Sequence, residues 1–170
     1  RLKCVDRVID AFAIVHRRRP EAVLNIVGDG PMRRSLERQS AALGLGGSVV
    51  FHGFLSEDRK IRLLQASRVY LSASQFEGFG IPPVEAMAAG TVPVVSRIPA
   101  HAFLFQDMPV GFLTGSTEEM AERALQLLDD EALRQRMALD GRELVCRTWT
   151  WGAVAARYRE LIERVLASGR

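Results

Sequence analysis

The sequence has few cysteines and no long apolar run, and these absences exclude several classes of protein. Its two cysteines, Cys4 and Cys146, are isolated and far apart, so they predict neither a disulfide framework nor a metal site. No apolar stretch approaches the roughly 20 residues that a membrane-spanning helix needs, and no signal peptide opens the chain. We therefore expect a cytoplasmic location, with the inner face of the membrane as the alternative.

An excess of charge of one sign is also missing. The chain has 23 Lys and Arg against 20 Asp and Glu, a net charge of +3 over 170 residues. This small positive net charge is compatible with anionic ligands but is too low to indicate nucleic-acid binding, so no nucleic-acid partner is expected. The length suits a single domain, residues 1–170. Because the chain begins without methionine and inside an element, we expect it to be an excised fragment.

Short apolar runs alternate with amphipathic segments along most of the chain. Strands are predicted at Val23–Val27, Val49–Phe51, Val69–Leu71, Val92–Ser96 and Val110–Leu113. Helices are predicted at Val5–Arg18, Met32–Leu43, Ser56–Ala66, Pro82–Gly90, Ser116–Leu128, Glu131–Cys146 and Trp151–Leu166. The segment Arg97–Asp107 shows no period and is predicted to be a loop. The alternation predicts an α/β fold, a Rossmann-like parallel sheet with helices on both faces and a ligand crevice at the carboxyl ends of its strands.

One stretch, Glu77–Gly90, has the features of a site for anions and polyols. Two glycines flank Phe79, so the backbone there can pass very close to a ligand, and Pro82 and Pro83 suit the first turn of a helix. Exposed amides and the helix dipole favour a phosphate, while carboxylates favour sugar hydroxyls. These residue types also leave open an ordinary glycine-rich turn, with Glu85 as a first-turn acid.

The turn Gly28-Asp29-Gly30-Pro31 follows a predicted strand, as a dinucleotide-binding motif would. The third glycine of that motif would fall at position 33, which is Arg33. No acid follows at the spacing that a ribose 2′-hydroxyl needs. These two departures exclude a nicotinamide cofactor.

The fourteen residues Glu77-Gly78-Phe79-Gly80-Ile81-Pro82-Pro83-Val84-Glu85-Ala86-Met87-Ala88-Ala89-Gly90 resemble the Glu-x7-Glu signature of retaining, GT-B-fold, nucleotide-sugar-dependent glycosyltransferases of family 4 (glycosyl transferases group 1). The likeness extends from about Lys3 to Trp151. It implies the donor-binding half of a two-domain enzyme whose N-terminal acceptor domain is absent from this chain. It also implies transfer of a hexose such as mannose or glucose from a GDP- or UDP-sugar to a surface polysaccharide or glycolipid. For the full-length protein, peripheral membrane contact is left open.

The resemblance assigns roles residue by residue. Glu77 matches the first signature glutamate, beside the donor sugar, and Lys3 matches the lysine that pairs with the diphosphate, so these two are the candidate catalytic residues. Glu85 matches the glutamate that binds the ribose hydroxyls. Backbone contacts to the donor are implied for Gly28, Gly53, Phe54, Leu55, Gly78, Phe79, Gly80 and Ile81. The nucleobase would lie on Gly53–Leu55. These backbone contacts do not indicate whether the base is guanine or uracil.

No metal or other cofactor is expected, because Lys3 and the helix dipole would stabilise the departing diphosphate. Glu77 is expected to position the sugar rather than to act as a nucleophile, because transfer on the leaving-group face requires no covalent intermediate.

Some residues depart from the family pattern. Arg1 lies only two residues before Lys3, whereas the family places an arginine several residues earlier, at the end of a first strand that is missing or truncated here. After Ile98-Pro99-Ala100-His101 the usual acid is replaced by an apolar run, which is expected to pack against something absent from the chain. The roles of His52 and His101 are left open between structure and ligand. Trp149 and Trp151 are predicted to anchor the last helix in the core.

Two other functions on the same fold are left open. A nucleotide-sugar epimerase would require catalytic acids and a histidine that converge on the sugar. A non-catalytic nucleotide-binding domain would keep the site without turnover. Fold alone excludes neither.

Overall fold

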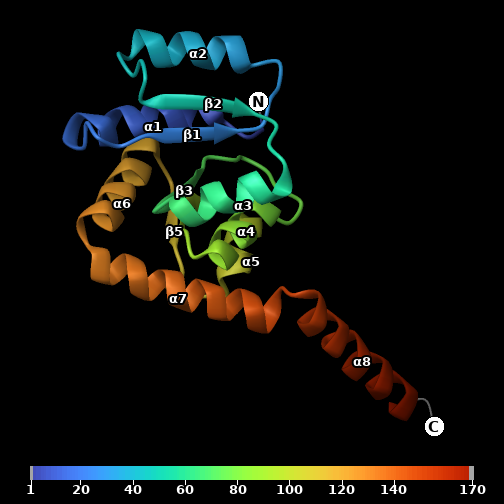
Figure 1. Ribbon diagram of the computed structural model, residues 1–170. Coiled ribbons are helices and arrows are strands. Elements are labelled where there is room, and N and C mark those ends of the chain that lie inside the picture. Colours follow the sequence, from blue (N-terminus) through green and yellow to red (C-terminus); the bar gives the residue numbers. More distant parts are fainter. Residues whose placement is uncertain (1, 169–170) are drawn as a thin grey trace.

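The computed structural model describes residues 2–168, which form the layered α/β protein of Figure 1. The strands are β1 (Leu24–Val27), β2 (Val49–Gly53), β3 (Val69–Ser72), β4 (Val92–Ser96) and β5 (Phe112–Thr114). The helices are α1 (Val5–Arg18), α2 (Arg33–Ala42), α3 (Glu57–Ala66), α4 (Ile81–Ala89), α5 (Pro99–Phe105), α6 (Thr117–Asp129), α7 (Glu131–Thr148) and α8 (Trp151–Ser168). Arg1 lies outside the described residues.

All strand pairs between named strands are parallel, and helices connect successive strands. β1 pairs with β2, and β3, β4 and β5 pair in that order. Parallel pairing requires long crossover connections, which α2 and α4 provide for β1–β2 and β3–β4. The prediction of an α/β fold with parallel strands is therefore confirmed. Among the described residues, however, the strands form two hydrogen-bonded groups, β1–β2 and β3–β4–β5, and the edge strands β1 and β3 line a common cavity.

The core has two parts, one on each face of the strands. One cluster packs α1 and α6 against the strands, and the other joins α5 and α7 to them. Side chains alternate between faces along a strand, so Val94 of β4 belongs to the first cluster and Val95 to the second. Both are fully buried, which is the pattern of a central parallel strand.

Two glycines set the ends of α4, the helix that follows the loop at Gly78–Gly80. Gly80 precedes the helix with φ +92° and Gly90 follows it with φ +83°. Residues with side chains rarely adopt this left-handed backbone, and glycine adopts it readily. The helix therefore begins directly after the glycine loop, as the sequence predicted.

The segment predicted as a loop at Arg97–Asp107 contains a helix, α5, so that prediction is wrong. Pro99 suits its first turn, and Leu104 and Phe105 are buried on its inner side. Half of the apolar run therefore packs within this chain, whereas Ala102 and Phe103 are exposed. The helix spans seven residues, which is too short for a repeating pattern to show in the sequence.

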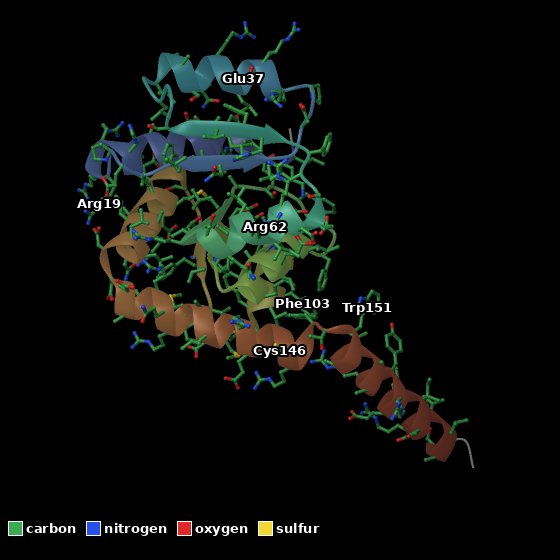
Figure 2. The ribbon with its side chains drawn as sticks, in the orientation of Figure 1. Arg19, Glu37, Arg62, Phe103, Cys146 and Trp151 are labelled. Atoms are coloured by element: carbon green, nitrogen blue, oxygen red, sulfur yellow. The ribbon has the colours of Figure 1, made fainter. Side chains whose placement is uncertain are left out.

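The last helix extends away from the rest of the protein (Figure 1). None of its described side chains is buried, and Trp151 at its start is 91% exposed (Figure 2). Trp149, just before it, packs against the second core cluster. The prediction of a core anchor therefore holds for Trp149 and is wrong for Trp151. Within residues 2–168, no helix combines the length and hydrophobicity needed to cross a membrane.

Candidate functional site

A cavity of about 790 Å³ runs along the whole length of β1 and β3 and reaches the carboxyl end of both strands. At this end it is lined by polar side chains from three places in the sequence, Lys3, Lys60, Ser74, Glu77 and Glu85. Pro82, in the first turn of α4, lies beside them. The predicted residues Lys3, Glu77 and Glu85 are therefore brought to one site, at the position where α/β sheets bind ligands.

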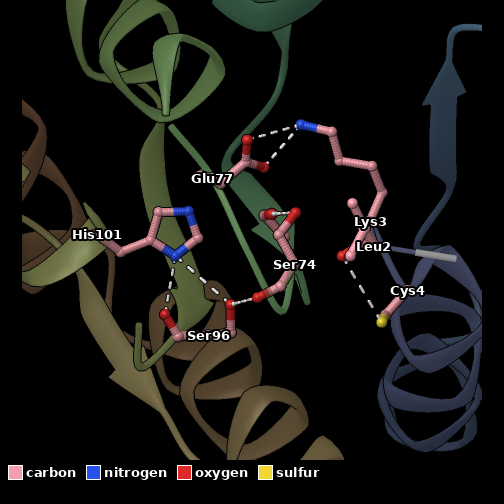
Figure 3. A network of polar contacts seen from close by, with 8 residues as sticks. Leu2, Lys3, Cys4, Ser74, Glu77, Ser96 and His101 are labelled. Carbon is pink, nitrogen blue, oxygen red and sulfur yellow. Dashed lines mark hydrogen bonds and ion pairs between the residues drawn. The ribbon is translucent and has the colours of Figure 1, made fainter. Parts of the chain in front are cut away.

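Lys3 and Glu77 form an ion pair in which the ammonium contacts both carboxylate oxygens (Figure 3). The Lys3 ammonium donates to both carboxylate oxygens, at 2.7 and 2.8 Å. The Glu77 side chain is only 13% exposed, whereas Lys3 is 62% exposed. Burial by itself would raise the pKa of Glu77, but hydrogen bonds from Lys3 and Ser74 outweigh it and hold that pKa below its ordinary value. Glu77 is therefore a carboxylate at neutral pH.

A second ion pair links α3 to α4. The Lys60 ammonium lies 2.9 Å from an oxygen of Glu85 and 2.9 Å from an oxygen of Glu57. Hydrogen bonds to Glu57 and Glu85 raise the pKa of Lys60, so it remains charged. Sequence reasoning missed Lys60 because nothing in its local pattern shows that α3 lies against α4.

His101 belongs to a buried network beside Glu77 (Figure 3). Its Nδ1 lies 2.8 Å from the Ser96 carbonyl oxygen, and the Ser96 hydroxyl donates to the Ser74 carbonyl. The ring is fully buried, and within residues 2–168 its Nε2 has no hydrogen-bond partner. Burial lowers the pKa of His101, against the opposing effects of the Ser96 bond and of the Glu77 charge. The histidine is therefore neutral: Nδ1 donates a hydrogen bond, and Nε2 is an acceptor whose hydrogen bond is not formed within the described residues.

The glycine loop reaches the start of α4 through Gly78, Phe79, Gly80 and Ile81. Gly80 is buried, whereas the other three are exposed. The first turn of α4 has amides without partners inside the helix and carries the positive end of its dipole. The loop and the helix can therefore present backbone donors to an anion near Glu77.

The turns after β1 and β2 meet at Gly28 and Gly53. The Gly28 amide donates to the Gly53 carbonyl at 2.7 Å, and both residues have positive φ. Beyond them Phe54 is 84% exposed and Leu55 is half-buried. None of these four residues lines the cavity, so the structure places them near the strand ends but does not bring them to the carboxylates.

His52 has a structural partner. Its Nε2 lies 2.8 Å from the Asn25 side-chain oxygen, across the β1–β2 pair. This contact supports the structural alternative for His52. In the part of the chain that the structure describes, no group of three or more His, Cys, Asp and Glu is arranged to hold a metal ion.

Comparisons with known proteins agree on one family. Residues 1–144 match the family "Glycosyl transferases group 1". The chain is 33% identical over 170 residues to the phosphatidyl-myo-inositol mannosyltransferase of Mycobacterium leprae, covering 98% of this chain and 44% of that protein. It is 31% identical over 168 residues to the N-acetyl-alpha-D-glucosaminyl L-malate synthase of Bacillus anthracis, covering 98% of this chain and 43% of that protein.

Among solved structures, the chain is similar to S. aureus TarM, crystallised with fondaparinux, alpha-GlcNAc-glycerol and UDP. The TM-score is 0.85 at 21% identity, over 95% of this chain and 33% of TarM, a likeness that concerns the fold. The chain spans less than half the length of the two curated relatives named above. The match over residues 1–144 and the shared fold show that the chain belongs to the glycosyl transferases group 1 family, whose fold is GT-B.

Proposed function

We propose that this chain is the donor-binding half of a retaining hexosyltransferase of family 4. The observation that carries the proposal is the pair of carboxylate–ammonium contacts, Lys3–Glu77 and Lys60–Glu85, on one cavity at the start of α4. Carboxylates accept hydrogen bonds from sugar hydroxyls, while ammonium groups and a helix N-terminus attract phosphate. A nucleoside-diphosphate sugar has all of these groups in one molecule.

Glu85 is the residue proposed to bind the ribose. Lys60 holds one of its oxygens, and the side chain is 33% exposed, so the carboxylate can still accept from two adjacent hydroxyls. Lys60 thereby fixes the direction of the carboxylate. The nucleobase would lie toward Gly53, Phe54 and Leu55, and the Gly28 turn would border it.

Lys3 and Glu77 are proposed to act at the sugar and the diphosphate. A lysine ammonium has three donors, so Lys3 can keep Glu77 and still donate to a phosphate oxygen. As the bond from the sugar to the diphosphate breaks, the electron pair goes to the departing oxygen. Lys3, the amides of Gly78–Ile81 and the α4 dipole would stabilise that charge, and no metal ion is needed.

The acceptor oxygen would then form its bond on the face that the diphosphate leaves, and its proton would pass to a diphosphate oxygen. This course retains the configuration and leaves Glu77 as a positioning group for the sugar hydroxyls. The acceptor site would be in the other half of the enzyme, so the isolated chain is proposed to be inactive alone.

The donor is proposed to be a GDP- or UDP-hexose and the acceptor a surface polysaccharide or glycolipid. One relative is a phosphatidyl-myo-inositol mannosyltransferase, which supports a mannose donor and a lipid-linked acceptor. TarM was crystallised with UDP, which supports a nucleoside diphosphate in this fold. A cytoplasmic protein at the inner membrane face would have access to both substrates.

A thermal-shift experiment with GDP, UDP and ADP tests the donor site. A nucleotide at about 100 times its dissociation constant stabilises by about 2.7 kcal/mol, or roughly 5–10 °C for a chain of this length. Glu85→Gln should abolish the shift. Glu57→Gln removes the other carboxylate on Lys60, which lies outside the cavity, and should keep the shift. Equal shifts in both variants would contradict the assignment.

A nucleotide-sugar epimerase is the second candidate, and one observation favours it. The fully buried His101 lies in the network beside Glu77 with a bare Nε2, so an acid and a histidine do approach one another. Incubation of the longer enzyme with UDP-glucose and no acceptor, followed by NMR of the anomeric proton, separates the two. An epimeric sugar nucleotide would support the epimerase, and an unchanged donor would support the transferase.

A further inference from the structure

A second cavity, of about 300 Å³, lies beside β5. Among the residues that the structure describes, it has no lining residue in common with the larger cavity at Glu77 and Glu85. In the same part of the chain, β5 pairs with β4 alone. The Arg97 amide donates to the Thr114 carbonyl at 2.8 Å, so the backbone of Leu113, one residue earlier, faces away from β4. Leu113 lines the cavity, which therefore lies at the outer edge of this strand.

Two arginines from different elements reach this cavity. Arg97, which follows β4, donates from Nη2 to the Leu113 carbonyl oxygen at 2.9 Å. The guanidinium of Arg123, on α6, lies over the Phe112 ring, with its Cζ 4.9 Å from the ring centroid. It also donates from Nη1 to the Gln126 side-chain oxygen at 2.9 Å. A guanidinium has five N–H donors, so these contacts fix both side chains and leave donors available to a ligand.

Neither guanidinium is paired with a carboxylate within residues 2–168, where the ion pairs involve other side chains. Two acids also line the cavity. The Glu119 carboxylate already accepts from the Gly115 amide at 2.7 Å, at the start of α6. The exposed Asp107 brings a second negative charge. The cavity therefore combines two unpaired cations with one engaged and one exposed carboxylate.

The remaining wall is apolar and closely packed. Phe105 is 4% exposed, and Met108 lies beside it along the cavity. A Cβ at Gly111 would collide with the Pro93 carbonyl oxygen and would lie 2.8 Å from the Phe105 ring. The backbone thus lies directly against the ring, and this wall is formed without a ligand. Small-molecule sites of about 300–1,000 Å³ combine such apolar walls with a few polar groups.

We propose that this cavity binds a small organic anion, a carboxylate or phosphate attached to an apolar body. The anionic group would accept hydrogen bonds from Arg97 and Arg123, because planar guanidinium groups match the oxygens of both kinds of anion. The apolar body would lie against Phe105 and Met108. Asp107 would oppose the anion and lower its affinity. This site is independent of the donor and the reaction proposed above.

NMR titration of the purified, ¹⁵N-labelled protein tests the proposal. The probes are phenyl phosphate and benzoate, and benzyl alcohol is the control that has the ring without the charge. The Gly111 and Leu113 amides should shift saturably with at least one anion and should not shift with benzyl alcohol. Saturable shifts confined to Gly78–Ile81 would place the anion at the start of α4 and contradict the proposal.

Four variants distinguish a site from a general effect of charge or folding. Arg97→Gln and Arg123→Gln should each weaken binding of the anion by at least about fivefold. Asp107→Asn should strengthen it by about twofold or more, because a like charge is removed. Arg136→Gln is the matched control, since Arg136 is an exposed arginine of α7 that lines neither cavity, and it should leave the affinity unchanged.

The opposite directions expected for Arg97→Gln and Asp107→Asn exclude a loss of fold as the common cause. Shifts that do not saturate with either anion would overturn the proposal. Equal affinities in Arg97→Gln and Arg136→Gln, or weaker binding in Asp107→Asn, would overturn it as well.

Discussion

The Phe79 ring packs edge-to-face against the Trp149 indole, with ring centroids 5.3 Å apart. Phe79 is in the glycine loop before α4, whereas Trp149 lies between α7 and α8. Phe103 of α5 packs on the same indole at 5.5 Å, and the Arg157 guanidinium of α8 lies 6.0 Å from it. The loop that carries Glu77 is therefore held by aromatic side chains from distant parts of the sequence, and this limits how far its amides can move.

Trp149→Ala should loosen this loop and destabilise the protein. Replacing a large buried aromatic costs about 3–5 kcal/mol, and the half-buried Trp149 should fall near the lower value. Trp151→Ala is the matched control, since Trp151 is 91% exposed and should change stability by less than about 0.5 kcal/mol. Urea unfolding of both variants measures this. Equal losses would show that the aromatic contact with Phe79 and Phe103 does not stabilise the fold.

The Lys3–Glu77 pair should make stability depend on pH at the acid end. The pKa of Glu77 is lower in the folded chain, so its charge stabilises the fold above the unfolded pKa, and this gain is lost as pH falls through the folded pKa. Glu77→Gln should therefore be less stable than wild type at about pH 7, and the difference should close at acid pH below the ordinary glutamate range. Urea unfolding across this range checks it. A difference that stays constant with pH would assign the effect to packing.

Lys3→Gln provides the partner measurement for that ion pair. If Glu77 stabilises the fold through its contact with Lys3, the double variant should lose less unfolding free energy at about pH 7 than the sum of the losses in the two single variants. Additive losses would mean that the contact at 2.7 Å contributes no coupling energy.

His101 should also make stability depend on pH, but for a different reason from Glu77. Burial lowers its pKa, so between the folded and unfolded pKa values the unfolded chain binds a proton that the folded chain does not. Stability should fall as pH decreases below about 6.5. His101→Gln has no such proton to bind and should show a flatter profile there, even if its stability at neutral pH is lower. Parallel profiles for the two proteins would contradict a buried neutral histidine.

Much of the fold follows from local pattern, and the remainder depends on contacts that no local pattern contains. The apolar spacing of α1 predicts Val5–Arg18, and that helix has these bounds. The seven residues of α5 are too few to repeat, so their burial became visible only in the packed structure. The Lys60–Glu85 contact joins α3 to α4 across 25 residues, so no local pattern predicts it. Trp149 and Trp151 are two residues apart in the sequence, yet only Trp151 lies in solvent.

The two glycines of the loop before α4, Gly78 and Gly80, should respond differently to alanine. Gly80 has φ +92°, and a Cβ there would lie 3.0 Å from the Leu104 side chain and 3.5 Å from the His101 ring. A left-handed backbone costs a residue with a side chain about 1–2 kcal/mol, and both neighbours are fully buried. Gly78 has ordinary φ, and no atom of the described residues 2–168 lies within 4 Å of its Cβ position.

Gly80→Ala should therefore lower the unfolding free energy by about 2 kcal/mol or more and weaken nucleotide binding, because the start of α4 must shift. Gly78→Ala should change the unfolding free energy by less than about 0.5 kcal/mol. Urea unfolding and GDP or UDP titration of both variants test this. If Gly78→Ala folds normally but loses the nucleotide, the ligand approaches the backbone at Gly78. If Gly80→Ala keeps both stability and affinity, the loop geometry does not limit binding.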